Sequence, residues 1–159
     1  MKSKNLGLSL FILIMTIVLS DCSSPSTPQS SDIANSIDVS YITGPQVDLP
    51  TGVNPLLSAW ITNQTKYCIN FPPDYGIKVF AETSDGWTEI PNRVKYISDH
   101  PVLLKPKGDI FSQHSLDAQP DLSALTLTQP TNFYVEISGH LCDDEKVIIE
   151  KKIPFVVAP

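Results

Sequence analysis

The sequence has few of the features that mark an enzyme or a nucleic-acid-binding protein. It contains 11 Lys and Arg against 17 Asp and Glu, for a formal net charge of −6, and this acidic balance argues against nucleic acid as a partner. It has no Gly-rich phosphate loop and no Gly-x-Ser-x-Gly elbow, and its carboxylates are scattered through predicted turns. We therefore expect no catalytic residues and no cofactor.

Metal-ligating residues are equally sparse, with three cysteines and three histidines in the chain. The nearest arrangement to a metal motif is His140-x-Cys142. A structural zinc site needs about four ligands, usually from two paired motifs. The other candidates, Cys68, His100 and His114, are isolated in the sequence, so we expect no metal.

The chain has one long apolar run. It spans residues 6–20 and follows Lys2 and Lys4. A run of about 15 residues suits a signal-peptide core and is short for a bilayer crossing, which needs about 20. The preceding lysines favour the cytoplasmic side, so we expect the rest of the chain to be exported.

The residues around Cys22 resemble a bacterial lipoprotein signal peptide. Cys22 follows the apolar run and the short lead-in Leu19-Ser20-Asp21, and it opens a Ser/Pro-rich stretch. The resemblance implies that residues 1–21 are removed and that Cys22 is lipidated. The lipid would anchor the protein to the outer face of a membrane, so that the domain lies outside the cytoplasm, in the cell envelope. Two acyl chains suffice for stable anchoring. Asp21 departs from the family's small neutral residue, and an uncleaved signal anchor is the alternative.

Composition divides the remainder into a tether and one domain. Residues 22–36 are rich in Ser, Pro, Thr, Gln and Asn, so they bury too little apolar surface to offset chain entropy and are predicted to be a disordered tether. Residues 37–159 are predicted to form a single folded domain.

This domain is predicted to be all-β, because apolar and polar residues alternate with period two. The best examples are residues 56–62, 77–82 and 132–141, and Ser84-Asp85-Gly86 is a strong turn signal. Pro154 places the last strand at a sheet edge or a bulge. About seven short strands favour a two-sheet antiparallel sandwich, with an up-and-down barrel as the alternative.

Three segments resemble the Ig-like or fibronectin-like domains of bacterial surface lipoproteins. They are residues 57–65, which end in an Asn-x-Thr turn, the turn at residues 105–108, and the strand at residues 132–138. The resemblance covers most of residues 38–158 and implies an Ig-like sandwich. That fold hosts many functions, so it does not decide this one.

Cys68 and Cys142 form an even pair in an exported domain, so they are either bonded to each other or two separate buried thiols. A disulfide closing so long a loop contributes roughly 4 kcal/mol in the chain-entropy model.

Three aromatic residues near turns or on the predicted outer face are Tyr75, Phe80 and Trp87. They form either a binding patch for protein or sugar, or caps on the ends of the sandwich core.

The combined pattern predicts a non-enzymatic cell-envelope lipoprotein whose sandwich binds or supports another envelope protein or a glycan through loops and edge strands. A protease-inhibitor-like or chaperone-like accessory of exported proteins is the alternative. A hydrolase with an unrecognised site would require a pocket with perturbed titratable groups.

Overall fold

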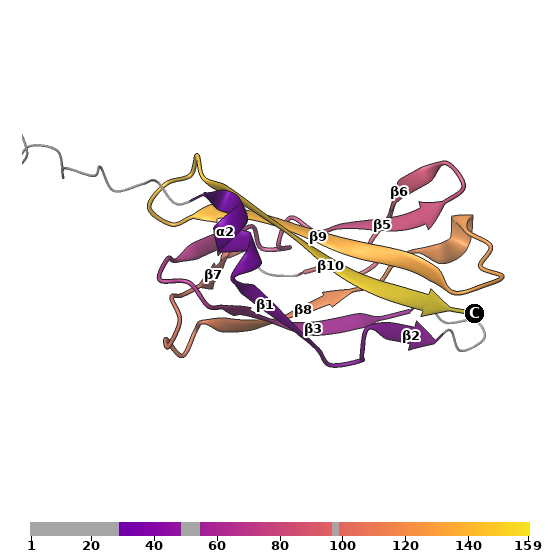
Figure 1. Ribbon diagram of the computed structural model, residues 1–159, viewed down its shortest axis with the longest axis horizontal. Helices are drawn as coiled ribbons and strands as arrows, with labels where there is room; N and C mark the ends of the chain where they lie inside the picture. Colours follow the sequence, from indigo (N-terminus) through magenta and orange to yellow (C-terminus); the bar gives the residue numbers. More distant parts are fainter. Residues whose placement is uncertain (1–28, 49–54, 97–98) are drawn as a thin grey trace, which may run out of the picture.

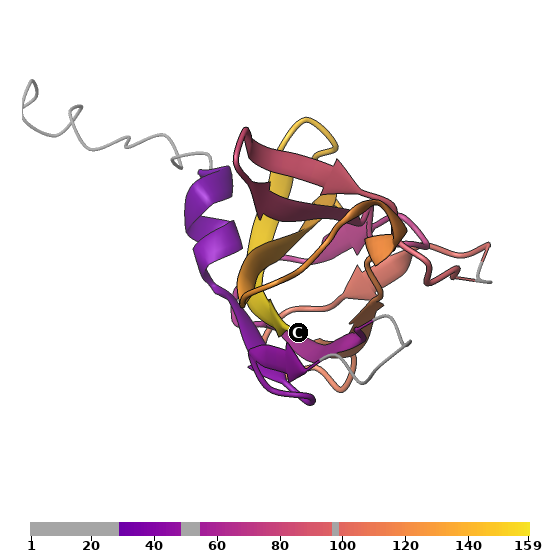
Figure 2. The ribbon, with the colours of Figure 1, turned by 90° about the vertical axis from the view of Figure 1, so that its right-hand side faces the viewer.

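The computed structural model describes residues 29–48, 55–96 and 99–159, and within them the chain forms two packed β-sheets with one short α-helix (Figures 1 and 2). The elements in chain order are α2 (Ser30–Asn35), β1 (Ile37–Tyr41), β2 (Gln46–Asp48), β3 (Leu57–Asn63), β4 (Ile69–Phe71), β5 (Lys78–Thr83), β6 (Gly86–Ile90), β7 (Val102–Leu104), β8 (Gln113–Ala118), the 3-10 turn η1 (Leu122–Ala124), β9 (Thr131–Leu141) and β10 (Ile148–Ala158).

The smaller sheet has the strand order β1-β3-β8. The larger sheet follows the path β2-β10-β9-β4-β7, with β5 paired to β9 and β6 paired to β5. The predicted all-β, two-sheet sandwich is confirmed. The described residues form ten strands rather than about seven, and the β2–β10 ladder is parallel whereas every other named ladder is antiparallel.

The core lies between the sheets and follows the predicted alternation. In β9, Phe133, Val135 and Ile137 are buried, while the residues between them lie on the outer face of the larger sheet. Leu57 and Ile61 of β3 are fully buried from the opposite sheet. Each such side chain contributes about 1.5–3 kcal/mol through burial, so β3 and β9 are central to the stability of the sandwich.

The folded part begins earlier than predicted, because Ser30–Asn35 forms helix α2 and packs against β10. Ile33 and Ala34 are buried there. The prediction of a disordered tether is therefore wrong for residues 30–36. Composition did not indicate this contact, because most of the residues around Ile33 and Ala34 are polar. Gln29 is also described, and its carbonyl accepts hydrogen bonds from the N–H groups of Asp32 and Ile33. Residues 22–28 of that segment lie outside the described residues.

Candidate functional site

The outer face of the larger sheet carries a cluster of three aromatic side chains. Phe80 of β5 stacks on Tyr134 of β9 with ring centroids 4.7 Å apart. Trp87 of β6 meets the same Tyr134 edge-on, also at 4.7 Å. Trp87 is 50% exposed. Aromatic pairs of this kind contribute about 0.5–1.5 kcal/mol beyond their buried area, so the rings hold one another in place.

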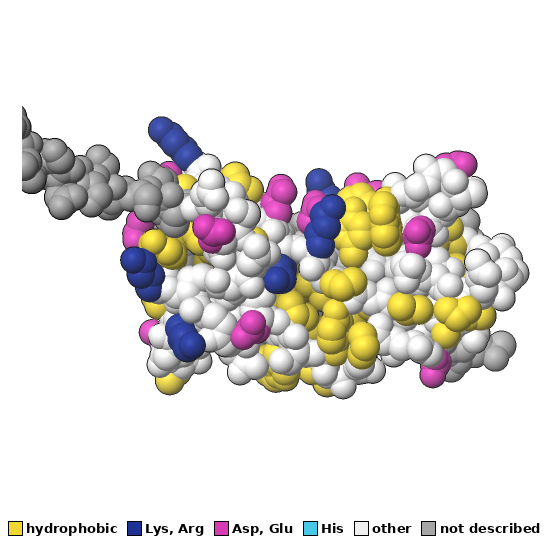
Figure 3. All heavy atoms as spheres, viewed as in Figure 1, with side chains coloured by type: hydrophobic (Ala, Val, Ile, Leu, Met, Phe, Trp, Pro, Cys, Tyr) yellow, Lys and Arg dark blue, Asp and Glu magenta, His cyan; other side chains and the backbone are white. Residues whose placement is uncertain are grey.

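Trp87 and Tyr134 form one wall of a surface groove of about 620 Å³, and Phe80, which is not among its lining residues, stacks on Tyr134. The groove runs across β6, β5, β9 and β10 to the end of β1, and Figure 3 shows hydrophobic side chains gathered in a band across the middle of the molecule on this side. We call it the aromatic groove, and its lining residues are Tyr41, Pro45, Glu82, Trp87, Asn132, Phe133, Tyr134, Lys152, Pro154, Phe155 and Val156.

The polar side chains of the aromatic groove already have partners. Asn132 Nδ2 donates to Glu82 Oε2 at 2.7 Å. Lys152 Nζ lies 4.6 Å from the centroid of the Tyr134 ring and 3.9 Å from Glu136 Oε2. A cation over an exposed ring gains about 0.5–1 kcal/mol. Few free hydrogen-bonding groups are therefore left, and the groove is suited to apolar groups.

Pro154 lines the groove on the stretch of β10 that β2 does not cover. Val156–Ala158 of β10 pair with β2, so Pro154 lies just outside that ladder. Its carbonyl accepts a hydrogen bond from the Tyr41 hydroxyl and therefore points away from β9. In an extended strand the backbone nitrogen of the same residue points to the same side as its carbonyl. The missing N–H therefore costs no ladder bond. The prediction of an edge strand applies only to this stretch, because β10 as a whole lies between β2 and β9.

Tyr75 does not belong to this surface, although the sequence grouped it with Phe80 and Trp87. It is fully buried and packs against Phe71, Tyr96 and His114. Its backbone has φ 59°, a left-handed conformation, and its N–H donates to the carbonyl of Pro72 at 2.8 Å. The turn was recognised correctly, but its left-handed residue turns the ring into the sandwich rather than out to solvent.

The hydroxyls of Tyr75 and Tyr96 close the free edge of β8. Tyr75 Oη donates to the carbonyl of Ser115 at 2.8 Å and also contacts His114 Nδ1. Tyr96 Oη donates to the carbonyl of Asp117 at 2.6 Å and accepts from its N–H at 2.9 Å. We call this arrangement the tyrosine seal. Residues 93–96 form no strand, and the side chain of Tyr96 instead bonds the edge of β8.

Burial raises the pKa of Tyr75 far above its ordinary value of 10.0, and the negative charge of a neighbouring ionised Tyr96 adds to that increase. Burial also raises the pKa of Tyr96, partly offset by its hydrogen bond with the backbone of Asp117. Both hydroxyls therefore remain protonated donors well into the alkaline range.

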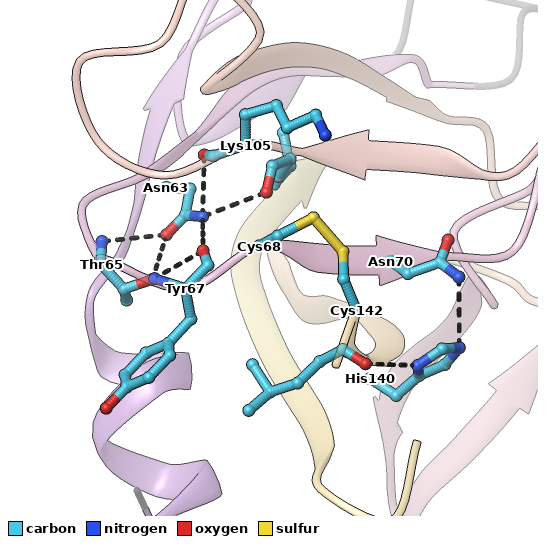
Figure 4. Close-up of a disulfide and its surroundings, with 10 residues drawn as sticks. Asn63, Thr65, Tyr67, Cys68, Asn70, Lys105, His140 and Cys142 are labelled. Atoms are coloured by element: carbon cyan, nitrogen blue, oxygen red, sulfur yellow. Dashed lines mark hydrogen bonds between the residues drawn. A yellow bond between two sulfur atoms is a disulfide. The ribbon is translucent and has the colours of Figure 1, made fainter. Parts of the chain in front are cut away.

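Away from the groove, Cys68 and Cys142 form a disulfide with their Cα atoms 5.4 Å apart (Figure 4). The bridge joins the residue before β4 to the residue after β9, and Cys142 N–H donates to the Cys68 carbonyl at 3.0 Å. The alternative of two separate thiols is thus not what the structure contains.

Beside the disulfide, the buried amide of Asn63 links three segments (Figure 4). Its Nδ2 donates to the carbonyls of Tyr67 at 2.7 Å, Lys105 at 2.9 Å and Leu104 at 3.2 Å. Its Oδ1 accepts from the N–H and hydroxyl of Thr65 at 2.9 and 2.7 Å. The Asn-x-Thr segment therefore holds the end of β3 to β4 and β7.

His140 and Cys142 have other roles than metal binding in this arrangement. The Cys142 sulfur is in the disulfide, and His140 contacts Asn70 Nδ2 through Nε2 at 3.3 Å and the Leu141 carbonyl through Nδ1 at 2.8 Å. No group of three or more His, Cys, Asp and Glu side chains in the described ranges is placed to hold a metal ion.

The predicted signal segment and Cys22 lie outside the described residues. Among residues 29–48, 55–96 and 99–159, no helix combines the length and hydrophobicity that a membrane crossing requires.

Two groove residues, Tyr134 and Lys152, were not identified as candidates from the sequence. The alternation in residues 132–141 placed Tyr134 on the face opposite Phe133, so its exposure was foreseeable. Its contact with Phe80 required the pairing of β5 with β9, in which these residues are directly opposite each other. Lys152 required the β9–β10 register in the same way, because it lies opposite Glu136.

Comparisons with known proteins give no family. No family model matches the chain, and no curated protein matches its sequence. The solved structure of the periplasmic chaperone SfaE aligns with a TM-score of 0.44 and 14% identity over 77% of this chain and 57% of that one, so the chain spans little more than half of SfaE. The X-ray structure of Northeast Structural Genomics Consortium target SoR45 aligns with a TM-score of 0.45 and 16% identity over 80% of this chain and 89% of that one. Similarities this weak assign no function.

Proposed function

We propose that the protein is a non-enzymatic, membrane-anchored binding domain of the cell envelope that holds an extended, apolar segment of another envelope protein in the aromatic groove. The observation that carries this proposal is the groove itself, in which Trp87 and Tyr134 form a preassembled aromatic wall on the solvent face of the sheet, with Tyr134 stacked on Phe80. Rigid aromatic rings provide a large contact area at low entropic cost, which is why they are enriched in recognition surfaces.

A protein segment fits the groove better than a glycan does. Sugars are recognised through many hydrogen bonds, whereas Glu82 and Asn132 are bonded to each other and Lys152 is engaged by Tyr134 and Glu136. Apolar side chains require no such partners and gain about 25 cal/mol for each Å² of apolar surface removed from water.

Export and anchoring are part of the proposal. The Cys68–Cys142 disulfide supports an oxidising compartment outside the cytoplasm, where such bonds persist. Cys22, with its lipoprotein-like surroundings, is the residue that we propose carries the lipid.

The test is selection of displayed random 12-residue peptides on the full chain, purified in detergent. We expect enrichment of sequences rich in apolar residues. Trp87→Ser should then weaken binding of the selected peptides at least tenfold, because it removes one wall of the groove.

The matched control is Trp60→Ser. Trp60 is comparably exposed, at 42%, but lies on β3 in the other sheet, so its loss should leave affinity within twofold. Failure to enrich any apolar sequence, or equal losses in the two variants, would rule out the groove as the binding site.

A further inference from the structure

Strand β6 has a free edge. The hairpin register places Thr83 opposite Gly86, Ala81 opposite Thr88 and Val79 opposite Ile90. When a two-residue turn closes an antiparallel hairpin, the flanking pair exchanges both backbone hydrogen bonds and every second pair repeats this. The alternate residues, Trp87 and Glu89, therefore direct their backbone N–H and C=O groups away from β5. No hydrogen bond from the described part of the chain reaches those groups.

Two other edges of the sandwich are closed. The tyrosine seal covers β8, and Asn92 Oδ1 accepts the next outward N–H, that of Gln119, at 2.9 Å. The end of β10 is covered by its parallel ladder with β2. Since an open edge is a template for another strand, an edge left open beside closed ones is a site for strand addition.

The charge around β6 indicates which kind of residues an added strand would contain. Glu82, Asp85 and Glu89 are exposed on the β5–β6 hairpin, against one lysine, Lys78. The Glu82 carboxylate is shared with the neutral amide of Asn132, and the Glu89 carboxylate has no hydrogen-bond or ion-pair partner among the described residues. Pairing with a second copy would bring like charges together, whereas a basic segment would be attracted.

We propose that a basic, extended segment of a different protein adds to β6 as a further strand, with Lys or Arg facing Glu89 and an apolar side chain beside Trp87. Trp87 lies on the groove side of the sheet, opposite Glu82 in the β5–β6 ladder. A segment paired with β6 thus places every second side chain at the mouth of the aromatic groove. This inference rests on the proposed function and specifies how the bound segment is held.

The test measures binding by fluorescence anisotropy. A labelled octapeptide Lys-Thr-Val-Thr-Lys-Thr-Val-Thr, which alternates Lys and Val along one face of a strand as Glu89 and Trp87 alternate on β6, is titrated with the full chain in detergent. The comparison peptide has Glu in place of each Lys. We expect binding of the first at least tenfold tighter than of the second. Equal affinity for the two peptides would overturn the predicted basic character of the partner.

Two variants at Glu89 separate charge from backbone pairing. Glu89→Gln removes the carboxylate charge, and Glu89→Pro removes the charge and also the outward N–H. Proline is tolerated on an edge where its missing N–H faces solvent, and circular dichroism verifies the fold. We expect up to about fivefold weaker binding for Glu89→Gln, and about a further tenfold for Glu89→Pro. Equal affinities of the two variants would overturn strand addition.

A second measurement requires no change in the protein. The Lys/Val octapeptide with every backbone nitrogen methylated keeps its side chains but loses its N–H donors, and its binding should be lost. Retained binding of the methylated peptide would contradict strand addition. If Trp87→Ser abolishes binding while Glu89→Pro and methylation have no effect, the groove remains the site and only strand pairing fails. If neither this octapeptide nor any selected peptide binds, the proposed function itself fails.

Discussion

Tyr96→Phe isolates the contribution of the tyrosine seal. The substitution keeps the ring and removes one hydroxyl, so the carbonyl of Asp117 loses its donor and the N–H of Asp117 loses its acceptor. Two partly buried hydrogen bonds at about 0.5–1.5 kcal/mol each predict a loss of about 1–3 kcal/mol. With an unfolding entropy of about 2.1 cal/mol/K per residue for about 130 residues, the melting temperature should fall by about 4–11 °C.

The assay is thermal unfolding followed by circular dichroism at pH 7. Tyr67→Phe is the matched control, because Tyr67 is half-buried and its hydroxyl has no hydrogen bond within the described residues. We expect that control to change stability by less than about 0.5 kcal/mol. Equal melting temperatures for the two variants would show that the hydroxyl of Tyr96 does not stabilise the β8 edge.

The same seal predicts a loss of stability at alkaline pH. Burial raises the pKa of Tyr75 and Tyr96 above the unfolded value of 10.0. Folding therefore favours the protonated hydroxyls, so their contribution is complete below about pH 10 and declines as pH rises through the raised folded values. Denaturant unfolding between pH 9 and 12 should show a smaller alkaline loss for Tyr96→Phe than for the parent chain, and parallel curves would refute the linkage.

Three further outcomes are expected. Replacing both Cys68 and Cys142 with Ala should lower the free energy of unfolding by up to about 4.5 kcal/mol, the loop-entropy value for a separation of 74 residues, and an unchanged denaturant midpoint would contradict a stabilising bridge. Asn63→Ala should cost at least about 3 kcal/mol, because several buried backbone groups lose their partner, whereas the exposed Asn35→Ala should change stability by less than about 0.5 kcal/mol in the same denaturant titration. Palmitate supplied to expressing cells should label the parent chain and not Cys22→Ala, and label on both would exclude Cys22 as the acylated residue.

The alternation of apolar residues predicted the sandwich because each sheet buries one face. Strands such as β3 and β9 are long enough for that period to be visible. Strand β2 was not predicted, because its three residues are stabilised by their parallel ladder with β10 rather than by any pattern of their own. Helix α2 was missed for a similar reason, since only Ile33 and Ala34 mark its buried side.

The site was predicted less completely than the fold. Phe80 and Trp87 were identified because they flank a turn or lie on an outward face, and both belong to the aromatic cluster. Tyr75 has the same local signals, but a left-handed backbone directs its ring inward. Tyr134 joins the cluster only through strand register, which no local pattern in a single sequence specifies.

The position of β1 determines how the domain would respond to mechanical load. A pull on the N-terminus enters through α2 and then β1 (Figure 1). β1 is bonded to β3 over five residue pairs, from Ile37 with Asn63 to Tyr41 with Ala59. A force along the axis of β1 strains these bonds together, in shear, so they resist as a group rather than opening one at a time. The disulfide lies outside this path, so tension on a domain tethered at its N-terminus would be resisted by the β1–β3 ladder and by the packing of α2 on β10, without a covalent crosslink.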